Sequence, residues 1–89
     1  MLKITRRDGP GDEGVLKIEG TLGGAWVREA RAACDRAVAE RGRVVLDLAG
    51  VVFVDRSGAA LLDSLREDPR VEIQSVSAFV AEMLKGGAA

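Results

Sequence analysis

The stretch spanning residues 43–65 constrains the fold more than any other part of the chain. Residues 44–48 form a near-continuous aliphatic run of the kind found in the central strands of parallel sheets. Ala49-Gly50 interrupts this run, and a second apolar piece follows at residues 51–54. From Ala59 onward the leucines recur at helical spacing. The stretch therefore predicts a strand that leads through a short loop into a helix.

The predicted loop consists of Asp55, Arg56, Ser57 and Gly58. Asp55 and Ser57 are both favourable N-cap residues, whose side-chain oxygens can accept hydrogen bonds from the free amides of the first helical turn. Gly58 lets another group approach the backbone closely. A helix N-terminus carries partial positive charge and free N–H donors, which would favour a phosphate attached there. Ser57 is therefore a candidate phosphorylation site, and the simpler alternative is that its hydroxyl only caps the helix.

Size and composition indicate a single small globular domain over residues 1–89. A chain of this length buries only about 60–65% of its unfolded surface, so a partner could readily add stability. A hydrophobic content of 47% together with 30% charged residues is typical of a globular rather than a disordered chain. A net charge of −1 provides no general attraction for nucleic acid or for an acidic membrane.

Several residue types that catalysis commonly uses are missing. The chain has no His and no Tyr, which removes the commonest general base and every hydrolase triad that relies on His. Residues 20–24 are rich in glycine but match neither the P-loop nor the dinucleotide-binding pattern. We therefore expect a non-catalytic protein without a metal site or cofactor. The first residues contain no apolar run long enough for a signal or a membrane span, which points to the cytoplasm.

The chain before the central stretch predicts two strands and a helix. Leu2 to Thr5 and Val15 to Ile18 suit two antiparallel strands, joined by a polar loop from Arg6 to Gly14. A helix is expected from Ala25 to Arg41, ended by Gly42. Its apolar positions recur every three or four residues. They are Trp26, Val27, Ala30, Ala33, Cys34, Ala37 and Val38.

Two residues of this apolar stripe allow a functional interpretation beside the structural one. Cys34 is a lone thiol and so a possible nucleophile, but no His is present to activate it, and a buried, inert thiol is the favoured interpretation. Trp26 suits either a core position near the start of the helix or an exposed contact for a partner. We therefore retain Trp26 as a candidate partner-binding residue.

The chain after the central stretch predicts one more strand and one more helix. Pro69 discourages helical continuation at Asp68, and residues 71–74 alternate apolar and polar side chains as an edge strand does. Ser75 or Ser77 then caps a last helix that ends at Gly86-Gly87. Its expected apolar stripe is Val76, Phe79, Val80, Met83 and Leu84.

The complete order is therefore β-β-α-β-α-β-α. Strand–helix–strand connections favour right-handed parallel crossovers, so the second, third and fourth strands should be parallel. The first strand should lie antiparallel at one side. The fold class is α/β, with a small, mixed, four-stranded sheet and helices packed on it.

The central stretch resembles the STAS family, the domain of anti-sigma-factor antagonists. The family motif is an apolar strand ending in Asp, a loop, and then Asp-Ser-Ser/Thr-Gly-Leu, and LDLAGVVFVDRSG follows that pattern. The resemblance extends from about Gly20 to Leu65. It implies that Ser57 corresponds to the phosphoacceptor, Asp55 to the acid before it, and Gly58 to the glycine that opens the helix. Arg56 stands where the family usually has Ser, and Ala59 where it usually has Leu.

The resemblance implies a regulatory binding protein, an anti-sigma-factor antagonist. Its partner would be an anti-sigma factor that is also a Ser/Thr kinase of the GHKL type. Asp55, Arg56, Ser57, Gly58 and Trp26 would contact that partner, and phosphorylation of Ser57 would abolish binding. One alternative is a STAS subunit that braces the ATPase of an ABC lipid-transport complex. Another is a STAS module that binds a nucleotide or a lipid.

Overall fold

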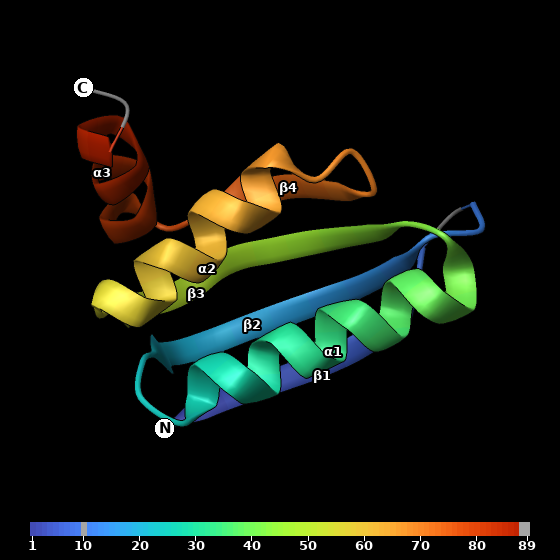
Figure 1. Cartoon of the computed structure of the whole chain (residues 1–89), viewed down its shortest axis with the longest axis horizontal. Coiled ribbons are helices and arrows are strands. Elements are labelled where there is room, and N and C mark those ends of the chain that lie inside the picture. The colour runs from blue at the N-terminus through green and yellow to red at the C-terminus, as the bar shows by residue number, and fades with distance from the viewer. Residues whose placement is uncertain (10, 88–89) are drawn as a thin grey trace.

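Four strands and three helices alternate along the chain in the expected order. The computed structural model describes residues 1–9 and 11–87, with side chains described up to Met83. The α/β class and the β-β-α-β-α-β-α order are both confirmed (Figure 1). The elements are β1 (Leu2–Asp8), β2 (Gly14–Leu22), α1 (Trp26–Arg41), β3 (Val44–Val54), α2 (Arg56–Glu67), β4 (Val71–Val76) and α3 (Ala78–Gly87).

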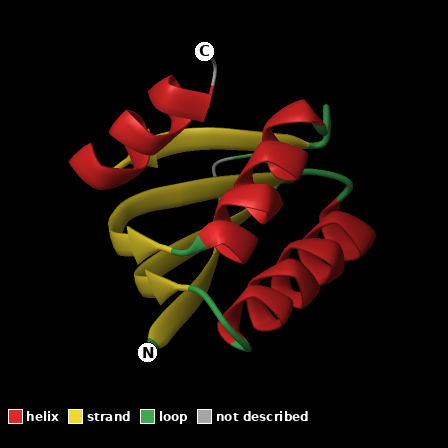
Figure 2. Cartoon of the chain, turned by 60° about the vertical axis from the view of Figure 1, so that its left-hand side comes forward, coloured by secondary structure: helices red, strands yellow, loops and turns green. Residues whose placement is uncertain are grey.

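The strands form one mixed sheet in the order β1-β2-β3-β4. β1 pairs with β2 in antiparallel fashion, whereas β2, β3 and β4 are parallel to one another, as expected. The two crossovers, through α1 and through α2, step across the sheet in the same direction. Right-handed connections therefore place α1 and α2 on the same face of the sheet, side by side (Figures 1 and 2). Both helices begin at the end of the sheet where β2 and β3 finish.

The central strand runs further than expected, because Ala49-Gly50 forms an irregularity rather than a break. The pairing of β2 with β3 shifts register between Lys17 and Glu19, opposite this point. The Asp47 carboxylate accepts a hydrogen bond from the Ala49 amide at 3.1 Å. Gly50 lies close against Glu19, since a Cβ atom at Gly50 would be 2.7 Å from Glu19 Cγ. The glycine thus lets the strand continue to Val54 through a bulge.

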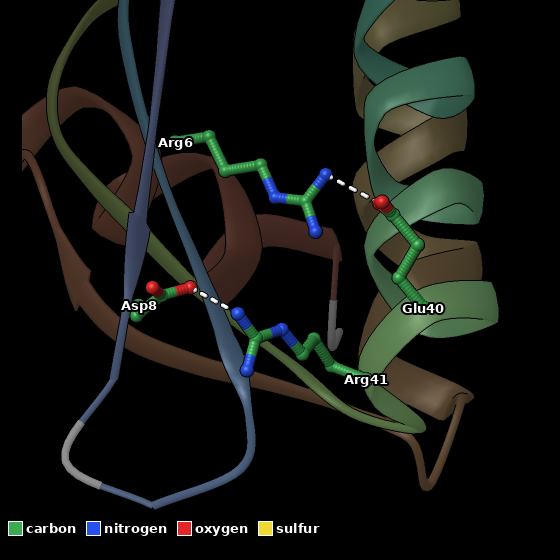
Figure 3. Close-up of polar contacts among 4 residues, drawn as sticks. All are labelled: Arg6, Asp8, Glu40 and Arg41. Atoms are coloured by element: carbon green, nitrogen blue, oxygen red, sulfur yellow. Dashed lines mark hydrogen bonds and ion pairs between the residues drawn. The ribbon is translucent and has the colours of Figure 1, made fainter.

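The first hairpin is also longer than expected, because residues 6–8 pair with residues 14–16 instead of forming a loop. Two ion pairs join this part of β1 to the end of α1 (Figure 3). Arg6 lies 2.6 Å from Glu40, and Arg41 lies 2.5 Å from Asp8. All four side chains are partly exposed, so solvent screening keeps the contribution of each pair to stability small.

The last helix packs beside β3, beyond the point where β4 ends. Ser77 is its cap, because its hydroxyl oxygen accepts a hydrogen bond from the Val80 amide at 3.2 Å. The same hydroxyl donates to the Val51 carbonyl of β3 at 2.5 Å. Val76 belongs to β4 and not to the helical stripe, Val80 is buried, and Phe79 is exposed. The expected contribution of Leu84 concerns a side chain outside the described residues.

The core lies between the sheet and the helices. Ala30, Cys34 and Ala37 of α1 are buried in this core, as the apolar stripe predicted. Gly42 ends the helix in the left-handed conformation, at φ 79°. Cys34 is 2% exposed, and burial raises the pKa of its thiol to about 11. No helix in the part of the chain that the structure describes is long and apolar enough to span a membrane.

The burial of Cys34 leads to a prediction about thiol labelling. Because burial blocks reagents and keeps the thiolate scarce at pH 8, a disulfide reagent such as DTNB should not label the native protein. The same reagent should label one thiol per chain at once in denaturant, where Cys34 is exposed. The absorbance of the released thiolate measures both. Rapid labelling without denaturant would contradict the buried, inert state.

Candidate functional site

The Asp55 carboxylate lies at the centre of the candidate site. Asp55 has an extended backbone (φ −86°, ψ −176°) and is the N-cap of α2. Its Oδ1 atom accepts hydrogen bonds from the Gly58 amide and from the Ser57 hydroxyl, both at 2.8 Å. Its Oδ2 atom accepts a hydrogen bond from the Gly24 amide, in the connection between β2 and α1, at 2.9 Å. One side chain therefore joins the starts of two helices.

These donors keep the carboxylate ionised. The hydrogen bond from the Gly58 amide, followed by those from the Ser57 hydroxyl and the Gly24 amide, holds the pKa of Asp55 below its ordinary value. The position at the N-terminus of α2 favours negative charge as well. Asp55 is therefore a fixed anion at neutral pH.

Ser57 is an exposed residue in the first turn of α2. Its hydroxyl donates to Asp55, and the helix is capped by Asp55. The alternative that Ser57 serves only as the N-cap is therefore wrong. The structure places this hydroxyl at the surface and at a helix start.

Gly58 is buried, unlike the other residues expected to contact a partner. A Cβ atom at this position would clash with the Leu22 carbonyl oxygen and would lie 2.8 Å from Val54 Cγ1. The absence of a side chain lets α2 pack directly on the ends of β2 and β3. Gly58 therefore positions the site, and we correct our expectation that it contacts a partner.

Trp26 and Arg56 complete the set of candidate residues. Trp26 is the first residue of α1 and is 41% exposed, so it lies at the surface and not in the core. It lies two residues after Gly24, whose amide donates a hydrogen bond to Asp55. The Arg56 side chain is exposed, and no ion pair involves it among the described residues. The structure thus gathers the candidate residues at one end of the molecule.

Sequence reasoning missed a set of exposed apolar side chains next to this site. Val52 is 67% exposed and Phe53 is 49% exposed, although both lie in the apolar run just before Asp55. The Phe53 ring packs against Phe79 of α3, with ring centroids 5.6 Å apart. The signal was present in the sequence, because a strand of four consecutive apolar residues with one face on the core exposes part of them.

A separate groove of about 510 Å³ lies between β1 and α1, and it includes none of the candidate residues. Its floor is apolar, and its rim carries charges of both signs, with the Arg6–Glu40 ion pair across it (Figure 3). The lining residues are Ile4, Arg6, Leu16, Glu29, Ala33, Arg36 and Glu40. Among the described residues, no cluster of three potential metal ligands occurs.

A small mixed sheet with two helices on one face, and an Asp-capped helix that presents a serine, defines a STAS-type domain. The family model described as "Mlab, STAS domain" matches residues 5–86. The chain therefore belongs to the STAS family, and the resemblance seen around residues 20–65 extends over almost the whole sequence. STAS domains are generally non-catalytic. No curated protein matched the chain in a sequence comparison.

The close packing of Gly58 predicts that Gly58→Ala destabilises the domain. Glycine inside a helix is normally less favourable than alanine, so the substitution would otherwise stabilise α2. The clash with Leu22 and Val54 should reverse the sign and cost about 1–3 kcal/mol in the free energy of unfolding. Urea unfolding measures this value. Ser64→Ala, on the exposed face of the same helix, is the control and should stay within about 0.5 kcal/mol of the parent.

The lowered pKa of Asp55 predicts a pH-dependent contribution to stability. Because the carboxyl pKa is lower in the folded chain than in the unfolded one, the stabilisation is present above the unfolded value of about 3.9 and is lost as the pH falls through the folded value. The difference in unfolding free energy between the parent and Asp55→Asn should be constant above about pH 5 and shrink in stronger acid. Urea unfolding over this pH range measures it. A difference that grows on acidification would contradict the assignment.

Proposed function

We propose that this chain is a non-catalytic STAS module that binds another protein through the end of the molecule where α1 and α2 begin. The contact residues are Trp26, Asp55, Arg56 and Ser57, which we call the docking surface. The partner is an anti-sigma factor that is also a Ser/Thr kinase of the GHKL type, and phosphorylation of Ser57 abolishes binding. The observation that carries this proposal is the exposed Ser57 hydroxyl, 2.8 Å from the Asp55 carboxylate at the start of α2.

Electrostatics support phosphorylation as the switch. A phosphate on Ser57 adds about 1.5–2 negative charges beside a carboxylate that is already ionised. An acidic or apolar partner surface that fits the unmodified serine would then meet like charge and an added desolvation cost. Arg56 is the neighbouring cation, and in the unmodified form it is available to pair with an acidic group of the partner.

The composition of the docking surface also supports a protein partner. Trp is among the residues that most often dominate binding energy at interfaces, and Trp26 is exposed beside the site. Val52 and Phe53, just before Asp55, are also exposed, and Phe53 packs against the exposed Phe79 of α3. The Phe53–Phe79 pair is thus an exposed apolar cluster, and such clusters commonly mark interaction surfaces.

A second candidate function uses the same surface without modification. In this proposal the domain is the STAS subunit that braces the ATPase of an ABC lipid-transport complex. Arg56 favours it, because it replaces the serine that the phosphorylated members of the family usually carry before the phosphoacceptor. Both proposals place the domain in the cytoplasm.

The proposed switch is tested with the purified GHKL kinase of the same organism. Incubation with ATP should add one phosphoryl group to the parent and none to Ser57→Ala, as intact-mass spectrometry measures. Ser57→Asp should weaken binding to that kinase in titration calorimetry by 10-fold or more, which corresponds to about 1.4 kcal/mol. Ser64→Asp adds the same charge elsewhere on α2 and should bind as the parent does.

Three outcomes separate the two proposals. Phosphorylation of Ser57 with loss of kinase binding supports the anti-sigma-factor antagonist. Absence of any phosphoryl adduct, together with unchanged binding by Ser57→Asp, overturns the switch. Co-purification of the tagged domain with an ABC ATPase, lost in Trp26→Ala, supports the bracing subunit instead.

A further inference from the structure

The start of α1 depends on the backbone of Gly23 and Gly24. The Trp26 amide donates to the Gly23 carbonyl at 3.1 Å, and the Val27 amide donates to the Gly24 carbonyl at 3.2 Å. The N-cap residue, Ala25, provides no side-chain hydrogen bond. The position of Trp26 therefore follows that of the two glycines.

Those glycines are held in turn by Asp55. The Gly24 amide donates to Asp55 Oδ2 at 2.9 Å. Gly23 lies against the same carboxylate, since a Cβ atom at Gly23 would be only 2.7 Å from Asp55 Cγ. The carboxylate consequently has no room to turn toward this loop without displacing it.

The other oxygen of Asp55 is occupied by α2. Oδ1 accepts from the Ser57 hydroxyl and the Gly58 amide. A continuous series of contacts therefore leads from the Ser57 hydroxyl, through one carboxylate, to the loop that sets the start of α1. Ser57 and Trp26 belong to different helices, yet only Asp55 and the Gly23–Gly24 peptide group separate them along this series of hydrogen bonds.

We propose that Asp55 couples the state of Ser57 to the position of Trp26, so that modification of Ser57 alters the docking surface at both residues. Phosphorylation transfers the γ-phosphoryl group of ATP to Ser57 Oγ, with ADP as the leaving group and release of the hydroxyl proton. The oxygen that donated to Asp55 then has no hydrogen, and two anions face each other. This inference rests on the proposed function, because it describes how the same surface is regulated.

Two physical effects displace Asp55 in the modified state. Like-charge repulsion pushes its carboxylate away from the phosphate. The phosphate oxygens also compete for the amides of the first turn of α2. In the unmodified protein one of these amides, that of Gly58, donates to Asp55. Because Gly23 packs on the carboxylate, its displacement weakens the Gly24 hydrogen bond and releases the loop. Asp55 is thus a positioning residue, and the switch removes a well-placed tryptophan besides adding charge.

The sole tryptophan of the chain makes this coupling measurable without any partner. Trp26 is the only Trp and no Tyr is present, so fluorescence excited at the indole band reports on that residue alone. Ser57→Asp should shift the emission maximum of Trp26 and increase its quenching by acrylamide. Hydrogen exchange followed by NMR should show faster exchange of the Gly24 amide in the same variant. Ser64→Asp carries the matched charge on the exposed face of α2 and should leave all three readouts unchanged.

The Asp55→Asn background tests whether the carboxylate is the link. Asparagine has one acceptor oxygen, and its amide group cannot accept from Gly24, so Asp55→Asn alone should reproduce the shift and the faster Gly24 exchange. Adding Ser57→Asp to Asp55→Asn should then change little further, which is the non-additivity expected of residues acting in series. Far-UV circular dichroism and the urea midpoint confirm that each variant is folded. The charge at Ser57 suits the helix N-terminus, so folding should be retained.

The outcomes distinguish this inference from the proposed function. The coupling is overturned if Ser57→Asp leaves Trp26 fluorescence and Gly24 exchange as they are in the parent. It is also overturned if the changes caused by Ser57→Asp simply add to those caused by Asp55→Asn. If the coupling fails while Ser57→Asp still abolishes kinase binding, the switch is a local charge effect. If the coupling is observed and kinase binding by Ser57→Asp is unaffected, the proposed switch of partner binding is overturned and the conformational link remains.

Discussion

The parallel pairing of β2 with β3 is the constraint on which the rest of the molecule depends. Parallel neighbours cannot be joined by a tight turn, so the chain must cross the sheet through α1, and then through α2 to reach β4. Each helix therefore begins where a parallel strand ends, which is also where binding sites of open α/β sheets gather. Gly24 and Asp55 are 31 residues apart in sequence and yet become hydrogen-bonded neighbours for this reason. The topology of the sheet thus brings the starts of α1 and α2 together.

The sequence predicted the elements and their order well, because hydrophobic periodicity and helix-ending glycines are local signals. The end of α1 at Gly42 is one example. The errors concern boundaries that depend on a partner strand. The strand β3 continues past Gly50 because Glu19 lies across from it, and β1 continues through Arg6 because β2 supplies a hydrogen-bonding edge and α1 supplies Glu40. The pattern of residues within one segment of the sequence contains no information about which other strand or helix will lie beside it.

The sequence singled out the residues around the start of α2 but did not distinguish their structural roles. Asp55 and Ser57 are both good capping types, and only the backbone decides between them: Asp55 is extended and precedes the helix, while Ser57 lies inside its first turn. Gly58 was correctly expected to allow a close approach, but its neighbour is the Leu22 carbonyl and not a partner protein. Four consecutive apolar residues in one strand already indicate that some of them are exposed, whereas the contact of Phe53 with Phe79 depends on where α3 packs, which periodicity does not encode.

Helix capping alone would not require an aspartate at the N-cap of α2. A serine or threonine there would satisfy the Gly58 amide with its one oxygen, and an asparagine would leave its amide group facing the Gly24 donor. Only a carboxylate offers acceptors on both sides while also accepting from the Ser57 hydroxyl. The anion that holds the starts of α1 and α2 together is therefore also the group that a phosphate on Ser57 would repel most strongly, so the proposed sensitivity to modification would have the same physical origin as the stability of this end of the molecule.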